Sequence, residues 1–439
     1  MMKKLLCICS VLGLLFMACK KEEQAIPLNP VIKSIMPTQG PGKTIVSVKG
    51  KRFSSIPDEN IVKFAGINAR VVSATDTLLQ VEAPADGGTG AITVNVKGRL
   101  SKGPVFSYGE IAIEYLTVTY SGAEAGDAVG TLAEARFRSP EGVIMDSKGN
   151  LIVADRGNNR IKMITPAGEV SVIAGTGVAG TLDGAANVAQ FRNPYKVGID
   201  KDDNIYVADN GNHRVRKIAA GTGIVTTIAG SSAGFLDGVG TAARFNGPIA
   251  IATDLNGNVY VADNNNHAVR KIAPGGLVTT IGGNGTTGYS DGVWPNVRFA
   301  NPSGVAVDGE GNVLVADRKN NRIRKITVST GVVTTIAGNG LKESTDGNGL
   351  KSAFSEPFGI SVDAKGIMYI ADLTSHMIRL MRPSGDVITL GGDGTAGFAD
   401  GGKAGSKYNQ PTDAVVDAAG NIFVADLSNA RIRKITPGK

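Results

Sequence analysis

Three histidines occur in this chain of 439 residues, and their spacing makes them the first candidates for metal binding or catalysis. His213, His267 and His376 each follow an Asp by four residues, in three copies of one short block. Equal positions in successive copies could bring three imidazoles together around an axis. The other copies carry different residues at this position, namely Asn159, Asn321 and Ala430. The position thus belongs to the repeated pattern, so we interpret the histidines as turn caps and predict no metal or cofactor.

Two sets of Asp residues also recur once per copy and resemble carboxylate sites. The first set is Asp155, Asp209, Asp263, Asp317, Asp372 and Asp426, and the second is Asp127, Asp183, Asp237, Asp291, Asp346 and Asp400. Because every copy has both, we expect a structural role, in which the first set accepts backbone N–H bonds from the turn that follows it. A structural Ca²⁺ ion in a loop of the second set stays open.

Aromatic residues that differ between copies are the better candidates for contact with a ligand. Phe235, Tyr289 and Phe398 each lie two residues before an Asp of the second set, and Trp294, the single Trp, lies three residues after Asp291. Aromatic faces stack on the apolar faces of flat ligands such as sugar rings. We predict Phe235, Tyr289, Trp294 and Phe398 as ligand-binding residues. The alternative is that these rings only fill space between repeats.

Six copies of about 54 residues must position these side chains. The Asp residues of the first set are 54 or 55 residues apart, and each ends a block such as Val207-Ala208-Asp209. One copy contains four short runs with period two, at 304–308, 313–317, 322–327 and 332–337. Tight turns with a glycine such as Gly311 separate the first two. Four short strands per repeat are typical of a β-propeller.

The block from Val207 to Val215 resembles the NHL repeat. Six copies imply a six-bladed NHL β-propeller over residues 111–439. The sixth copy ends after its third strand, and residues 114–120 resemble a fourth strand, so we expect 114–120 to complete the last blade and close the ring. Third-strand arginines, which are Arg216, Arg270, Arg324, Arg379 and Arg433, are expected on the solvent side. Some NHL-type lyases bind zinc through histidines near the axis, which leaves an enzyme as an alternative.

A smaller all-β domain precedes the repeats at residues 27–110. Runs such as 44–50 and 91–96 alternate apolar and polar residues, as half-buried strands do. The ordered landmarks Pro30 to Pro37, Val48 to Phe53, Val62 to Gly66 and Phe106 to Tyr108 resemble the IPT/TIG family of immunoglobulin-like domains. That resemblance implies a β-sandwich that serves as a spacer or an interaction module.

The first residues read as an export signal. A basic start and an apolar run fit a signal peptide over residues 1–18. The sequence Leu15-Phe16-Met17-Ala18-Cys19 resembles a bacterial lipobox, which implies lipidation of Cys19 and a tether over 19–26. Lys20-Lys21-Glu22-Glu23 resembles the surface-export signal of Bacteroidota lipoproteins. We therefore expect a protein held at the outer membrane by its N-terminal lipid and facing the cell exterior.

The net charge and the sequence motifs narrow the range of functions that we predict. The net charge is +7, but residues 111–439 contain 32 basic and 31 acidic residues, so a nucleic-acid partner is not predicted. No nucleophile elbow, phosphate loop or HExxH motif is present. We predict a non-catalytic surface lipoprotein that binds a glycan or a partner protein through its long loops, as part of a polysaccharide uptake system. The alternatives are a lyase or hydrolase with a metal in the central channel, and a protein–protein scaffold.

Overall fold

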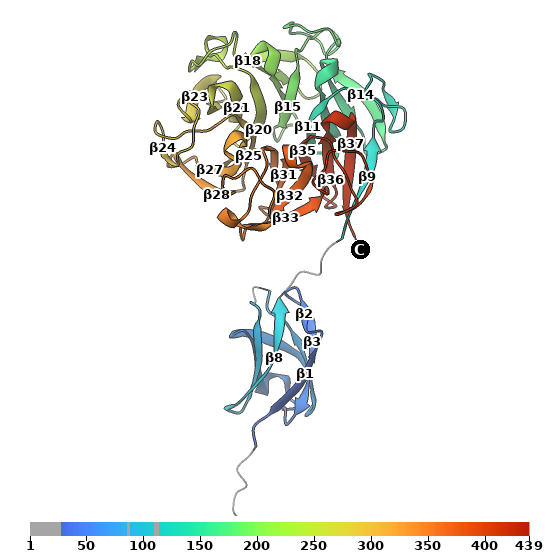
Figure 1. The fold of residues 1–439 in the computed structure, drawn as a ribbon, viewed down its shortest axis with the longest axis vertical. Helices are drawn as coiled ribbons and strands as arrows, with labels where there is room; N and C mark the ends of the chain where they lie inside the picture. The colour runs from blue at the N-terminus through green and yellow to red at the C-terminus, as the bar shows by residue number, and fades with distance from the viewer. Residues whose placement is uncertain (1–27, 86–87, 109–113, 439) are drawn as a thin grey trace, which may run out of the picture. The chain divides into compact units, whose positions relative to one another are not determined.

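The computed structural model describes residues 28–85, 88–108 and 114–438, which fall into two compact units divided between residues 112 and 113 (Figure 1). Both units are built from strands, so the predicted all-β class is confirmed. The expected signal peptide, Cys19 and the tether lie outside the described residues. Among the described residues, no helix is long and apolar enough to cross a membrane.

The first unit is a small barrel-like sandwich of short strands. Its central strands are β3 (Ile45–Lys51), β4 (Asn60–Phe64), β6 (Leu78–Glu82), β7 (Gly90–Val96) and β8 (Arg99–Tyr108). Inward-facing residues alternate along them, as in the pattern of β4, in which Asn60, Val62 and Phe64 are buried. The rings of Phe64 and Phe106 meet edge to face at 5.2 Å in this core. The unit is thus held by its own hydrophobic core.

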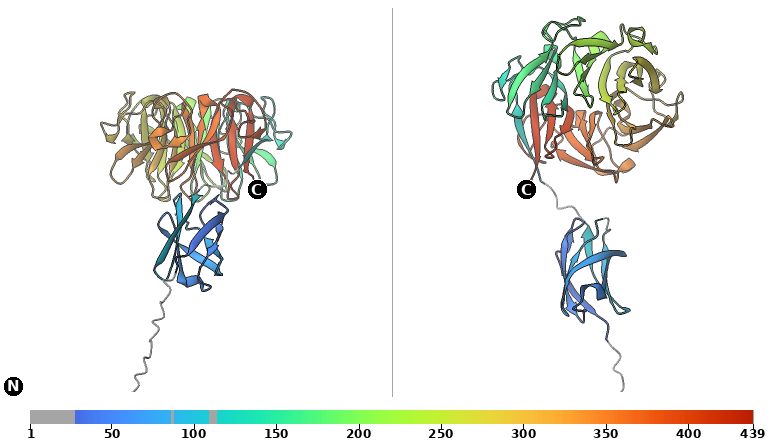
Figure 2. Two further views of the ribbon diagram at one scale, coloured as in Figure 1. Left: turned by 60° about the horizontal axis from the view of Figure 1, so that its bottom comes forward. Right: turned by 180° about the vertical axis from the view of Figure 1, so that it is seen from behind.

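The second unit is a closed ring of six four-stranded blades (Figures 1 and 2). The first strands of the blades contact one another in turn and enclose a central channel. They are β11 (Pro140–Met145), β15 (Pro194–Ile199), β20 (Pro248–Thr253), β25 (Pro302–Val307), β30 (Pro357–Val362) and β35 (Pro411–Val416).

Each blade is antiparallel from its first strand at the channel to its fourth strand at the rim. The second strands are β12 (Leu151–Asp155), β16 (Ile205–Asp209), β21 (Val259–Asp263), β26 (Val313–Asp317), β31 (Met368–Asp372) and β36 (Ile422–Asp426). The third strands are β13 (Arg160–Ile164), β17 (Arg214–Ile218), β22 (Ala268–Ile272), β27 (Arg322–Thr327), β32 (Met377–Met381) and β37 (Arg431–Pro437). Every residue of the second strands is buried, because neighbouring blades cover both faces of each sheet.

An N-terminal strand completes the sixth blade, as predicted. Strand β9 (Tyr115–Ser121) pairs antiparallel with β37, with Thr119 opposite Arg433. Its bounds lie one residue beyond the predicted 114–120. The hydroxyls of Thr117 and Tyr408 are 2.9 Å apart and buried, which ties this strand to the loop that precedes β35. The ring is therefore closed by hydrogen bonds between distant parts of the chain.

The long crossover loops between blades follow the rim of the blade that they enter. In the loop before β20, for example, β19 (Gly238–Val239) pairs with the fourth strand β23 (Leu277–Gly282) of the same blade. Four other blades have an equivalent two-residue strand, and the second blade has a single bridge between Gly184 and Val225. The crossover loops and the short turns after the second strands form one face of the ring, which we call the loop face.

Candidate functional site

The third-strand arginines are buried, and the expectation that they face solvent was wrong. Arg216, Arg270, Arg324, Arg379 and Arg433 are all 0% exposed. The crossover loop that enters each blade covers the face of the third strand that carries them. Around Arg216, for example, the Leu182 carbonyl oxygen and Oδ1 of Asp183, both in that loop, accept hydrogen bonds at 2.8 and 2.9 Å. The third strand pairs regularly with the second, and the extra residue of a β-bulge lies in the fourth strand, between Thr227 and Ala229.

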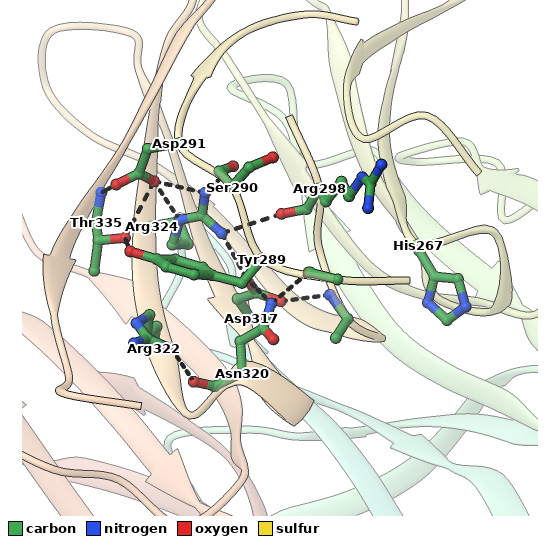
Figure 3. A network of polar contacts seen from close by, with 12 residues as sticks. His267, Tyr289, Ser290, Asp291, Arg298, Asp317, Asn320, Arg322, Arg324 and Thr335 are labelled. Atoms are coloured by element: carbon green, nitrogen blue, oxygen red, sulfur yellow. Dashed lines mark hydrogen bonds and ion pairs between the residues drawn. The ribbon is translucent and has the colours of Figure 1, made fainter. Parts of the chain in front are cut away.

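In the fourth blade, Arg324 joins the two Asp sets, as Figure 3 shows. Its Nη1 donates to Oδ2 of Asp317 at 2.7 Å, and its Nε and Nη2 donate to Oδ1 of Asp291 at 2.9 and 2.6 Å. Nη2 also donates to the Ser290 carbonyl oxygen at 2.7 Å. Asp291 accepts a further bond from the backbone N–H of Thr335 in the fourth strand, β28 (Val332–Ala337). The guanidinium thus fixes the crossover loop to its blade.

Both Asp sets therefore have structural roles, but one detail of the prediction was wrong. Asp317 accepts a backbone N–H bond from Ala300, in the crossover loop before its blade, and not from the turn that follows it. From that turn it accepts the Asn320 side-chain amide at 2.8 Å. Burial raises the pKa of Asp317 to about 6, against the lowering effect of Arg324. In the first blade Lys162 replaces the arginine.

The histidines connect neighbouring blades. Nδ1 of His213, His267 and His376 accepts the backbone N–H of Gly247, Asn301 and Gln410, respectively, each at 3.1 Å. Each imidazole therefore carries its proton on Nε2, and burial lowers its pKa. Asn159 and Asn321 make the same bond through Oδ1. Within the described part of the chain, no group of three or more His, Cys, Asp or Glu side chains is placed to hold a metal ion.

The predicted aromatic residues lie on the crossover loops and are 41% to 48% exposed. Tyr289 covers two arginines of its own blade, with its ring centroid 4.0 Å from Cζ of Arg322 and 4.9 Å from Cζ of Arg324 (Figure 3). Phe398 covers Arg431 in the same way, at 4.1 Å, in the sixth blade. These two rings stack on guanidinium groups and leave one face to solvent.

Phe235 and Trp294 lie together, in a groove of about 380 Å³ between the loops that enter the third and fourth blades. The other lining residues are Leu236, Asp237, Thr280, Asn284 and Pro295. The structure thus brings two of the four predicted aromatic residues together, while Tyr289 and Phe398 do not line this groove. Aromatic faces beside carboxylate, hydroxyl and amide groups suit a ligand with apolar ring faces and polar edges.

The central channel contains a second cavity, of about 330 Å³, lined by aliphatic residues of the six first strands. An ion pair limits it on the side of the loop face, where Nζ of Lys196 lies 3.0 Å from Oδ1 of Asp413. This pair joins the second blade to the sixth. A Cβ on Gly359 would lie 2.7 Å from Nζ of Lys196, so the glycine leaves the room that the lysine occupies.

Further charged side chains lie at the loop-face mouth of the channel. Glu141, the second residue of β11, is 2% exposed, and its burial raises the pKa to about 7. Nε of Arg156 lies 3.1 Å from its Oε2 without the alignment of a hydrogen bond, so this buried oxygen has no hydrogen-bond partner among the described residues. Arg156 donates from Nη1 to the Tyr195 hydroxyl at 2.9 Å.

Arg318 enters the same mouth from the fourth blade. Its Nε and Nη2 donate to Oε2 of Glu356 at 2.9 and 2.7 Å, while Lys319 and Lys342 donate to Oε1 at 3.0 and 2.9 Å. Burial would raise the pKa of Glu356, but these bonds lower it to about 2. Cζ of Arg318 lies 5.4 Å from the ring centroid of Phe358.

Sequence reasoning missed the charged residues of the first strands because they do not repeat. Three blades have apolar or small residues at the second and third positions of the first strand, such as Ile249, Ala250, Gly304, Phe358 and Gly359. Glu141, Lys196 and Asp413 depart from this in three adjacent blades. A position-by-position alignment of the six copies would have shown that departure.

Family models match both units of the chain. The IPT/TIG domain model matches residues 30–108, and the NHL repeat model matches 137–162, 191–218, 245–272 and 299–326. The six-bladed ring and these matches confirm both predicted resemblances. The NHL repeat-containing protein 2 of Gallus gallus is 29% identical over 334 residues, which are 67% of this chain and 46% of that protein. The chain spans roughly a quarter to a half of the length of the curated relatives most similar in sequence, and about a tenth of the teneurins that it also matches.

Two solved structures share the fold over nearly the whole chain. Both are auxiliary nutrient binding proteins, one from Bacteroides thetaiotaomicron and one from Bacteroides ovatus. The first is 18% identical, has a TM-score of 0.57, and covers 94% of this chain and 98% of its own. The second is 17% identical with a TM-score of 0.57, and covers 94% and 99%. At this identity the likeness shows a common fold.

Proposed function

We propose that this chain, an IPT/TIG domain followed by a six-bladed NHL-repeat propeller, is a non-catalytic binding protein that holds a glycan in the groove of Phe235 and Trp294. The observation that carries the proposal is the pairing of two half-exposed aromatic rings with polar groups in one groove. Sugar rings offer apolar faces for stacking and hydroxyls for hydrogen bonds, which this lining matches.

The cellular setting of the proposal comes from the N-terminus and from the solved structures. The lipobox at Cys19 and the acidic residues after it support anchoring by lipid at the outer membrane, with the propeller outside the cell. Proteins of similar fold from Bacteroides that bind nutrients support a role in uptake. We place the protein beside a polysaccharide uptake system, where it would collect substrate without cleaving it. The alternative function is binding of a partner protein in place of a glycan.

Affinity electrophoresis tests this function. Soluble protein comprising residues 20–439 is run through gels that contain plant, microbial or host polysaccharides, one per gel. We expect one polysaccharide to retard the protein, and the retardation to be lost in Trp294→Ala and reduced in Phe235→Ala. Phe398→Ala is the matched control, because Phe398 occupies the loop position of Phe235 and its exposure of 47% is close to the 48% of Trp294, but it lies outside the groove.

The outcomes of that experiment distinguish an error in the proposed site from an error in the proposed function. Retardation that is unchanged in Trp294→Ala contradicts the groove as the site. Absence of retardation by every polysaccharide contradicts the glycan, and crosslinking on intact cells would then identify the protein partner. Loss of retardation in Phe398→Ala to the same degree as in Trp294→Ala would indicate a general effect on the loops rather than contact with the ligand.

A further inference from the structure

We propose that the loop-face mouth of the central channel is a separate binding site, which takes the carboxylate group of a hydroxy acid between Arg156 and Arg318. Glu141 would accept a hydrogen bond from a hydroxyl of the same ligand. The site shares no residue with the groove of Phe235 and Trp294, and it goes beyond the function proposed above.

The two arginines come from opposite sides of the ring. Arg156 begins the turn after β12 in the first blade, and Arg318 begins the turn after β26 in the fourth, so three blades separate them in a ring of six. Their side chains are 27% and 25% exposed, and each has a terminal nitrogen, Nη2 of Arg156 and Nη1 of Arg318, that bonds to no other described residue. Two planar donors with unused N–H groups suit a carboxylate, which accepts such bonds in pairs.

The charge around the mouth favours an anion. Five cationic side chains gather there against three carboxyl groups, which are Glu141, Glu356 and Asp413. The excess is two positive charges when Glu141 is ionised, and larger when it is protonated. Arg156, Lys196 and Arg318 are mostly buried, whereas Lys319 and Lys342 are about half exposed. The three buried cations should attract an anionic ligand more strongly, because solvent screens them less.

An independent observation is that one carboxyl oxygen of Glu141 lacks a hydrogen-bond partner among the described residues. Its Oε2 is buried with no hydrogen-bond partner among the described residues, although Arg156 lies beside it. Such an atom is costly unless a donor completes it. A hydroxyl next to the ligand carboxylate supplies that donor, because the carboxylate would lie against the neighbouring Arg156. This requirement separates a hydroxy acid from a simple carboxylate.

The Lys196–Asp413 ion pair crosses the channel beneath the mouth. Nζ of Lys196 lies 5.1 Å from the ring centroid of Phe358, on whose ring Arg318 also lies. The ligand carboxylate would therefore stop above this pair. Small hydroxy acids, or the terminal uronate of an acidic glycan, fit this chemistry.

Isothermal titration calorimetry on residues 20–439 tests the proposal, with galacturonate, glucuronate and lactate as hydroxy acids, and galactose as the uncharged counterpart of galacturonate. We expect at least one acid to bind and galactose not to bind at this site. Arg156→Gln and Arg318→Gln should each weaken that binding by about tenfold or more. An oligosaccharide that ends in galacturonate is titrated as well. If it binds no more tightly than free galacturonate, the ligand is the free acid rather than the end of a glycan.

Arg160→Gln is the matched control. Arg160 lies in the first blade, is 27% exposed like Arg156, and pairs with Asp127 at 3.1 Å, the distance of the Arg156–Glu141 pair. The Arg160→Gln variant should bind the acid as wild type does. Trp294→Ala should do so too, because Trp294 belongs to the groove and not to the mouth of the channel. Arg156→Lys, which keeps the positive charge but loses the paired N–H donors of the guanidinium group, should bind the acid with intermediate affinity. The proposal is overturned if no acid binds, if galactose competes with the acid, or if Arg156→Gln binds as tightly as Arg160→Gln.

Discussion

Replacement of Arg324 by Met tests the internal network that holds each crossover loop to its blade. The change keeps most of the side-chain volume but removes the bonds to Asp317 at 2.7 Å and to Asp291 at 2.6 and 2.9 Å. Asp317 is 0% exposed and would be left as a buried charge without its cation. Removal of one partner of a buried pair costs about 3 to 5 kcal/mol of unfolding free energy. We expect a loss in this range for Arg324→Met.

Urea denaturation, followed by circular dichroism, measures this loss against Arg322→Met. Arg322 lies on the same strand and contacts the same Tyr289 ring, but it is only half-buried and donates to the backbone carbonyls of Asn320 and Asn339. Its loss leaves no buried charge unpaired and should cost about 1 kcal/mol. The double variant Arg324→Met/Asp317→Asn should recover part of the loss, because the uncompensated charge is gone.

The pH dependence of the same loss provides a second check. Burial raises the folded-state pKa of Asp317 to about 6 even with Arg324 present. A carboxyl with a raised pKa stabilises the fold below its unfolded-state value, and this stability is lost as pH rises through the folded-state pKa. Without Arg324, which lowers this pKa, Asp317 of the variant should have a higher pKa than in wild type. The deficit of Arg324→Met should therefore shrink as pH falls from neutral towards about 6 and stay constant below it, where both folded proteins hold Asp317 protonated. An equal cost for Arg324→Met and Arg322→Met at neutral pH would refute the network as a source of stability.

Two further predictions concern the channel. Burial raises the pKa of Glu141 to about 7, against the lowering effect of Arg156, Lys196 and Arg318. Its raised pKa means that stability present at low pH is lost as pH rises through about 7, so between about pH 5 and about pH 8 wild type should lose about 2 to 3 kcal/mol more unfolding free energy than Glu141→Gln. Equal pH dependence of the two proteins, measured by urea denaturation, would contradict the burial of an ionisable Glu141. Gly359→Ala should lower the melting temperature, because its Cβ would lie 2.4 Å from the Thr412 carbonyl oxygen and 2.7 Å from Nζ of Lys196. An unchanged melting temperature in differential scanning calorimetry would show that the Lys196–Asp413 pair can move aside freely.

The sequence was sufficient to predict those features that recur in every repeat. The ring of six blades follows from the spacing of residues such as Asp209 and Asp263. Closure by the strand at Tyr115–Ser121 follows from the strand that the sixth copy lacks. The burial of Arg324 could not be predicted from alternation, because its cover is the crossover loop with Ser290 and Asp291, which the pattern of a single strand does not report.

The candidate sites were less predictable. Phe235 and Trp294 were found because they are aromatic residues at variable loop positions, but their meeting in one groove depends on the path of the loops along the blade rims. Glu141 gave no signal by type or spacing, since an acidic residue occurs there in a single blade, and Arg318 shares its position only with Arg156. Their proximity follows only from closure of the ring, which brings blades far apart in the sequence to one channel.

Trp294 itself offers the most direct measurement of the central claim, because it is the only tryptophan in the chain. Its emission reports on the groove alone, so titration with the polysaccharide that retards the protein should change the intensity or wavelength of the emission in a saturable manner. Phe398→Ala should give the same curve as wild type, and Phe235→Ala a weaker one. A polysaccharide that binds by calorimetry but leaves the emission of Trp294 unchanged would contradict the groove as the glycan site.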